Sequence, residues 1–336
     1  MRSKFKPIKE TKIRSSKFLN KLVTAYKKDI NFLLKNKKSF VKFNCPACGN
    51  NNKKLEFIKG GLKYCRCIKC NTLYVNPRPS PELLKKFYSN SKGYEEWSKT
   101  VFPNSEKYRK KTIVADRIQI IKKKLNKTNK QKIALEIGPG FGTFAKALKE
   151  SKLFKNVTVI ELNKLLIKEC KRKKLEVIDK PIEEVKFKKK FDFISSFEVI
   201  EHLYSPKNFL KAVHKNLKRG GLLMLSCPNI SGFDNLILKK NSSTIEHEHL
   251  NYFNPYSIKK LLKLSSFKIL NLSTPGKLDF EIVKNFFIKN KNLIKKNSFL
   301  ETLLFSKFNN KIPENFQKFL YENCLSGHML VLAKKK

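Results

Sequence analysis

Four cysteines in the first quarter of the chain have the spacing of a metal site. Cys45 and Cys48 form one C-x-x-C pair, Cys67 and Cys70 form a second, and 18 residues separate the pairs. Each C-x-x-C turn can direct two thiolates to one point, and two such turns complete a tetrahedron around Zn²⁺ without leaving room for water. We therefore predict a structural zinc ribbon in residues 44–79, with a metal-free remnant or an iron–sulfur site as the alternatives.

A second feature that could do chemistry is a glycine turn. Residues 132–142 read K-I-A-L-E-I-G-P-G-F-G, an apolar strand that leads through three glycines into a helix. Such a turn lets a ligand approach backbone N–H groups at a helix N-terminus. A dinucleotide fingerprint would need glycine at Thr143, and a P-loop would need a lysine before it. The turn predicts a cofactor site of another kind.

The elements that position these residues follow from the hydrophobic pattern. Apolar runs alternate with helical patterns from residue 132 onward, which is typical of a parallel sheet with helices on both faces. The predicted strands are 132–137, 156–161, 175–179, 191–196, 222–227, 267–272 and 329–333, and the predicted helices are 143–151, 163–173, 206–218 and 256–265. The fold class is α/β, a doubly wound, mostly parallel, seven-stranded Rossmann-like sheet.

Further segments flank this sheet. Residues 1–43 form a basic arm whose apolar residues recur at helical spacing, and we expect that helix to pack on its own protein rather than on a membrane or partner. Residues 80–131 have a helical pattern and are predicted to form a bridge or lid. The cofactor-binding domain then spans 132–336, with a helical insertion at 280–323 before the last strand.

The motifs together resemble the class I S-adenosylmethionine-dependent methyltransferases. E-I-G-P-G-F-G over 136–142 is similar to their motif I, and V-T-V-I-E-L over 157–162 to their second strand with its terminal acid. F-D-F-I-S-S-F-E-V-I-E-H-L over 191–203 and the segment 217–229 resemble the fourth and fifth strands. The ribbon is similar to the N-terminal extension of many bacterial members. The arm and the insertion lie outside this resemblance.

The resemblance implies roles for individual residues. Gly138 and Gly140 would let the backbone approach the methionine part of the cofactor, and Glu161 would accept both ribose hydroxyls. The weakest match is Asp179, which stands two residues before the position where many relatives place an adenine-binding acid. The full implied cofactor set is Glu136, Gly138, Pro139, Gly140, Gly142, Glu161, Leu162, Asp179, Phe197 and Glu198.

Two histidines are candidates for a general base. An alcohol is a poor nucleophile at neutral pH, and histidine has a suitable pKa for removing its proton. His249 follows the fifth predicted strand and His202 the fourth, where this fold binds its ligands. We favour His249, then His202, with Glu246 or His247 as helpers. A purely structural role in a cap or loop is the alternative for each.

The leading functional hypothesis is therefore methyl transfer from S-adenosylmethionine to an oxygen of a small-molecule, sugar or lipid-linked acceptor. The formal charge of +47, from 74 Lys and Arg against 27 Asp and Glu, and the ribbon would also suit an RNA methyltransferase. However, no N/D-P-P-Y/F segment follows the fourth strand, and compositional bias explains scattered lysines equally well. A third hypothesis is an inactive scaffold protein with the same fold.

The location of the protein is the last inference from the sequence. No apolar stretch of 18 or more residues and no signal-peptide pattern occurs. The paired cysteines suit reduced thiols. We expect a cytoplasmic protein without a transmembrane segment, with peripheral contact of the basic arm to anionic membranes as an open alternative.

Overall fold

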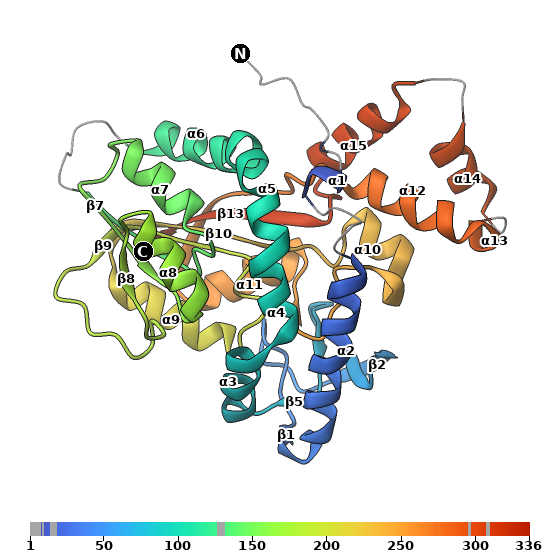
Figure 1. The fold of residues 1–336 in the computed structure, drawn as a ribbon, viewed down its shortest axis with the longest axis horizontal. Coiled ribbons are helices and arrows are strands. Elements are labelled where there is room, and N and C mark those ends of the chain that lie inside the picture. The colour runs from blue at the N-terminus through green and yellow to red at the C-terminus, as the bar shows by residue number, and fades with distance from the viewer. Residues whose placement is uncertain (1–7, 9, 14–18, 126–131, 295–296, 307–309) are drawn as a thin grey trace.

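A seven-stranded mixed sheet forms the centre of the computed structural model, which describes residues 8, 10–13, 19–125, 132–294, 297–306 and 310–336 (Figure 1). The strand order is β12-β13-β10-β9-β6-β7-β8. The strands are β6 (Ile133–Ile137), β7 (Asn156–Ile160), β8 (Glu176–Ile178), β9 (Phe191–Phe197), β10 (Leu217–Pro228), β12 (Phe267–Ser273) and β13 (His328–Lys335). β13 runs antiparallel to both of its neighbours, β12 and β10. The five strands β10, β9, β6, β7 and β8 run parallel to one another. The predicted seven-stranded α/β fold is confirmed.

Both faces of the sheet are buried, which explains the continuous apolar runs of its strands. Leu135 and Ile194 face one cluster, whereas their neighbours Ala134 and Phe193 face the other. On the first face lie α9 (Pro206–Asn216) and α11 (Pro255–Leu264). On the second lie α6 (Ala115–Lys124), α7 (Thr143–Glu150) and part of α8 (Lys164–Arg172).

The cysteine-bearing region forms a separate antiparallel sheet. Its strands are β2 (Lys53–Lys59), β3 (Leu62–Cys67) and β4 (Leu73–Val75), to which β11 (Asn251–Tyr252) is added. A short pair of β1 (Phe40–Val41) and β5 (Arg78–Pro79) borders it. Because β11 follows the fifth strand of the large sheet, the two sheets are joined by the segment that carries His249.

The N-terminal helices pack against the small sheet and against the helices that follow it. They are α1 (Glu10–Ile13), α2 (Leu19–Lys35), a 3-10 turn η2 (Lys37–Ser39) and α3 (Pro81–Asn90). A continuous helical stretch follows as α4 (Lys92–Glu96), the π-helical η3 (Trp97–Val101), α5 (Phe102–Arg109), the π-helical η4 (Lys110–Val114) and α6. Helix α2 lies beside α4, and Leu33 packs on Leu83 and Phe87 (Figure 1). The arm helix thus packs on its own protein, as predicted.

The predicted insertion before the last strand is helical and has its own apolar cluster. It contains α12 (Asp279–Lys289), α13 (Lys291–Ile294), α14 (Ser298–Phe305) and α15 (Ile312–Glu322). These helices pack with α10 (Phe233–Leu238), which leads into the 3-10 turn η5 (Lys239–Asn241), at the opposite end of the molecule from α8 (Figure 1). Within the described ranges, no helix is both long and apolar enough to cross a membrane.

Candidate active site and cysteine cluster

The glycine turn after β6 adopts the left-handed backbone that glycine favours. Gly138, Gly140 and Gly142 have φ values of +68°, +56° and +67°. A Cβ atom at Gly142 would lie 2.7 Å from Leu175, so this glycine allows the turn to pack closely on its neighbours. A Cβ at Gly140 would meet no atom of the described residues within 4 Å, apart from its chain neighbours. The open space of the turn is therefore at Gly140, next to the buried Pro139.

Glu161 follows β7 and has an oxygen available for a ligand. Its side chain is 5% exposed, and Oε1 accepts hydrogen bonds of 2.9 Å from the backbone N–H groups of Leu162 and Asn163. No described residue hydrogen-bonds to Oε2. Burial raises the pKa of Glu161 to about 7, against the backbone hydrogen bonds, which lower it. Two other residues of the implied cofactor set, Leu162 and Asp179, are exposed, in contrast to the buried Glu161.

Glu136 is a second buried carboxylate near the carboxyl ends of the central strands. It is 2% exposed on β6, and its Oε2 has no hydrogen-bond partner in the described part of the chain. Burial raises the pKa of Glu136 to about 8, and the nearby Arg117 guanidinium acts in the opposite direction. Two incompletely satisfied carboxylates near one glycine turn are the pattern expected of a polar ligand site.

Arg117 is a candidate functional residue that the sequence interpretation missed. It extends from α6 over the Phe197 ring, with its guanidinium carbon 3.7 Å from the ring centroid, and donates to Ser226 Oγ at 3.2 Å. The charges of Glu136 and Glu198 both act on it. No motif marks this position, because the packing of α6 on the sheet decides where the side chain extends.

Phe197 and Glu198 stand where β9 ends. Phe197 meets Phe144 edge to face, with centroids 4.9 Å apart. Glu198 has a φ of +54°, a costly conformation for a residue with a side chain, and such strain is most frequent at functional sites. Its Oε1 accepts from Ser226 Oγ at 2.7 Å and lies 3.5 Å from His328 Nε2. The carboxylate stays 45% exposed, so it can face an acceptor.

The two candidate histidines contact one another. The rings of His202 and His249 meet edge to face with centroids 4.6 Å apart. Nδ1 of His202 lies 3.1 Å from the Glu248 carbonyl, and Nδ1 of His249 lies 2.8 Å from the Thr244 carbonyl. Because a carbonyl only accepts, each Nδ1 carries the proton and each Nε2 keeps its lone pair. Burial lowers the pKa of both rings, which favours their neutral forms.

The loop that carries His249 is fastened to the N-terminal arm by buried polar contacts. Asp29 of α2 accepts hydrogen bonds of 2.8 Å from Ser91 Oγ and the backbone N–H groups of Lys92 and Gly93. His247 Nε2 lies 3.6 Å from the same carboxylate. The arm therefore contacts the loop that carries the candidate His249.

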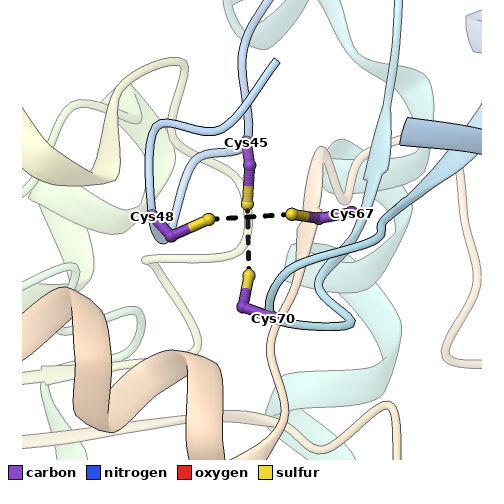
Figure 2. A group of neighbouring side chains, drawn as sticks. All are labelled: Cys45, Cys48, Cys67 and Cys70. Atoms are coloured by element: carbon purple, nitrogen blue, oxygen red, sulfur yellow. Dashed lines mark hydrogen bonds between the residues drawn. The ribbon is translucent and has the colours of Figure 1, made fainter. Parts of the chain in front are cut away.

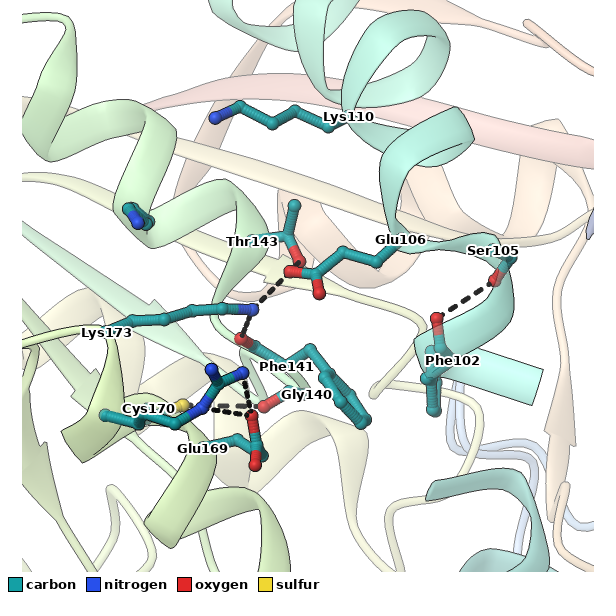
Figure 3. A network of polar contacts seen from close by, with 12 residues as sticks. Phe102, Ser105, Glu106, Lys110, Gly140, Phe141, Thr143, Glu169, Cys170 and Lys173 are labelled. Carbon is teal, nitrogen blue, oxygen red and sulfur yellow. Dashed lines mark hydrogen bonds and ion pairs between the residues drawn. The ribbon is translucent and has the colours of Figure 1, made fainter. Parts of the chain in front are cut away.

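Helix α5 is attached to the glycine turn by a charged network (Figure 3). Glu106 accepts from Thr143 Oγ1 at 2.7 Å and pairs with Lys173, whose Nζ also donates to the Phe141 carbonyl at 2.6 Å. Phe102 packs against Phe141 with centroids 5.6 Å apart. Although burial acts to raise it, the Lys173 and Thr143 hydrogen bonds hold the pKa of Glu106 below its usual value. This helix therefore contacts the glycine turn and the segment that follows it.

The four paired cysteines point to a common centre (Figure 2). Cys45 and Cys70 Sγ lie 3.4 Å apart, Cys48 and Cys67 Sγ lie 3.6 Å apart, and all four sulfurs lie within 4.8 Å of one another. Zn–S bonds of about 2.3 Å in a tetrahedron place the sulfurs roughly 3.8 Å apart, so the cluster fits Zn²⁺. Cys65 is outside the cluster, with its Sγ directed to the Asn76 carbonyl.

The two cysteine turns also have the same backbone geometry. The residue after each pair, Gly49 and Asn71, has a φ of +76° and +56°, respectively. The backbone N–H of each donates a hydrogen bond to the carbonyl of the first cysteine of its pair. The distance is 2.8 Å from Gly49 to Cys45 and 3.0 Å from Asn71 to Cys67. Two matching turns of this kind present their thiols in the same way, which supports the ribbon interpretation.

Comparison with known proteins gives the class. Residues 107–272 match the family model described as a methyltransferase domain, whereas no curated protein matches the chain. A SAM-dependent methyltransferase from Archaeoglobus fulgidus is 19% identical to this chain, with a TM-score of 0.47. The match covers 70% of this chain and 100% of that chain. One from Thermotoga maritima is 16% identical, with a TM-score of 0.45 and coverages of 72% and 99%.

The class therefore rests on the family match. It runs from α5 to the end of β12 and includes the glycine turn, Glu161, both candidate histidines and Arg117. The match supports a methyltransferase enzyme, with S-adenosylmethionine as the methyl donor.

Proposed function

We propose that this enzyme transfers the methyl group of S-adenosylmethionine to an oxygen of a small-molecule, sugar or lipid-linked acceptor. The observation that carries the proposal is the pair of neutral imidazoles, His202 and His249. They lie in loops that follow the carboxyl ends of the central strands, as the glycine turn does. Cofactor and acceptor groups meet at these strand ends in doubly wound sheets. The paired cysteines would hold a structural Zn²⁺, and the reduced thiols suit the cytoplasm.

The cofactor would be bound by polar groups that have spare capacity. Glu161 Oε2, without a partner among the described residues, would accept from the ribose hydroxyls. Glu136 would face the ammonium group, and Arg117 beside it would pair with the carboxylate of the methionine part. Among the described residues, only the chain neighbours of Gly140 come within 4 Å of a Cβ built there, which leaves room for the ligand to approach the backbone.

Methyl transfer is an in-line displacement. The acceptor oxygen forms a bond to the methyl carbon as the carbon–sulfur bond breaks, and the hydroxyl proton is lost. Enzymes of this kind accelerate the step mainly by holding the two reactants in line in a closed site. The α5 lid would close the site, while His249, with His202 beside it, would assist loss of the proton.

Following labelled methyl from the cofactor into separated fractions of a cell extract tests the proposal. Label is expected in metabolite, glycan or lipid methyl ethers, which withstand alkaline hydrolysis, unlike methyl esters. Label in RNA alone would contradict the proposed acceptor class and favour the RNA methyltransferase hypothesis, which the positive charge makes the next candidate. Failure to bind S-adenosylhomocysteine in calorimetry would contradict the cofactor assignment itself.

A further inference from the structure

A buried glutamate next to the candidate histidines lacks the partners that a carboxylate normally has. Glu201 is 0% exposed, and neither of its oxygens accepts a well-formed hydrogen bond from another described residue. Its backbone carbonyl accepts from the N–H groups of Leu250 and Asn251, so the residue is held in place. A buried carboxylate without partners is costly, and a native structure that keeps one needs a compensating group.

The surroundings of Glu201 offer metal-ligating atoms. One ligand atom from each of Glu201, His202 and His249 lies within 4.8 Å of the other two. Both imidazoles bond a backbone carbonyl through Nδ1, which fixes the tautomer and leaves a lone pair on Nε2. This is the arrangement in which histidines usually bind metal ions. The ligands come from two separate loops that the fold brings together.

A second buried group, Asp29, His247 and Glu248, is a weaker candidate for the same purpose. Asp29 already accepts three hydrogen bonds, and Ser91 Oγ lies 3.3 Å from Glu248 Oε1. Its carboxylates therefore have partners, in contrast to Glu201. The need for a cation is greater at the histidine pair.

We propose that Glu201, His202 and His249 bind a divalent first-row transition-metal ion, distinct from zinc in the cysteine cluster. Two imidazoles and one carboxylate favour ions such as Mn²⁺, Fe²⁺ or Co²⁺ over Ca²⁺ and Mg²⁺, which prefer oxygen ligands. Three protein ligands leave further coordination positions open. Glu198, three residues before Glu201, has an exposed carboxylate that can supply a fourth ligand or face the acceptor.

The ion gives the histidine pair a defined role, and this part rests on the proposed function. A hydroxyl oxygen bound to the ion is more acidic, so its proton is lost to water more readily. The resulting oxygen nucleophile attacks the methyl carbon, the carbon–sulfur bond breaks, and the products are the methyl ether, S-adenosylhomocysteine and one proton. In this mechanism His249 assists proton loss as a metal ligand rather than as a direct base.

The test measures Mn²⁺ binding by electron paramagnetic resonance in full-length protein that carries one equivalent of Zn²⁺ per chain, enough for the cysteine cluster alone. The expected result is one Mn²⁺ per chain in the wild type, with binding weakened at least about tenfold in Glu201→Gln and in His249→Ala. His214→Gln is the matched control and should bind Mn²⁺ like the wild type. His214 is on α9 and contacts the ring of Phe267. Burial raises the pKa of Glu201 and so favours its neutral form without a metal. Glu201→Gln keeps the size of that side chain and should therefore fold as well as the parent.

Several outcomes would overturn the inference. These are no Mn²⁺ binding at millimolar concentrations, unchanged binding in Glu201→Gln and His249→Ala, or binding lost in His247→Ala instead. Turnover that persists in a chelator and still depends on His249 would also overturn it, while leaving the proposed methyl transfer intact. Conversely, absent S-adenosylhomocysteine binding would contradict the proposed function without affecting the Mn²⁺ result.

Discussion

The guanidinium of Arg117 lies over the ring of Phe197, 3.7 Å from its centroid, and so a helix outside the sheet places a positive charge at the end of β9. If that charge pairs with the cofactor carboxylate, Arg117→Met should weaken S-adenosylhomocysteine binding by about 2 kcal/mol while keeping the stacking volume. Calorimetry measures this, with Lys122→Met, an exposed change on the same helix, as the control. Equal affinities for both variants would exclude the carboxylate contact.

Removing the Glu161 carboxylate should weaken cofactor binding at least as much as Arg117→Met does. Glu161→Ala loses two charge-assisted hydrogen bonds to the ribose, for which we expect a cost of roughly 2 to 4 kcal/mol. Titration with S-adenosylhomocysteine measures the loss. Glu169→Gln is a suitable control, because Glu169 is on the following helix and pairs only with Arg172 among the described residues. Wild-type affinity in Glu161→Ala would show that another group binds the ribose.

The stability of the ligand-free enzyme should fall as pH rises from about 5 to about 8. Burial raises the pKa of Glu136 to about 8, above the value of about 4.3 for an unfolded glutamate. The folded state therefore holds a proton that the unfolded state releases, and each pKa unit of difference corresponds to about 1.4 kcal/mol. Denaturant unfolding at several pH values should show a smaller decline in Glu136→Gln. An identical decline in both proteins would contradict the raised pKa.

The cysteine cluster should contain one tightly bound Zn²⁺ per chain. Cys45→Ser or Cys70→Ser should sharply reduce soluble protein, because the ribbon has few large apolar side chains to stabilise it without the metal. Cys65→Ser should retain zinc, since this thiol lies outside the cluster. Elemental analysis of protein purified without chelator decides the matter, and a zinc-free, folded wild type would refute the assignment.

His249→Ala should lower turnover at least about tenfold, the lower range of general acid–base effects, whether the ring acts as a base or as a ligand. Affinity for S-adenosylhomocysteine should hardly change, because the side chain is assigned to the acceptor side. His214→Ala is the control for removal of a histidine elsewhere. Unchanged turnover in both His249→Ala and His202→Ala would favour an acceptor that is already nucleophilic, such as an amine.

Local features of the chain were readable from the sequence because short-range geometry determines them. The apolar runs of β6, β7 and β9 match strands buried on both faces, and the predicted bounds differ from the observed ones by a residue or so. Glycines 138, 140 and 142 signalled a turn because only glycine adopts left-handed backbone readily. The cysteine spacing likewise predicted two matching turns around one centre.

The tertiary structure alone decided which side chains meet. His202 and His249 are in different loops, Arg117 comes from a helix before the sheet, and Asp29 comes from the arm. Their contacts depend on how α2, α6 and β11 pack across elements distant in sequence, and no local pattern encodes that packing. The missing partners of Glu201 likewise appear only after folding, because burial and hydrogen bonding are properties of the whole assembled chain. The sequence therefore determined the elements and the glycine turn, whereas long-range packing brought the candidate histidines, Arg117 and Glu201 into place.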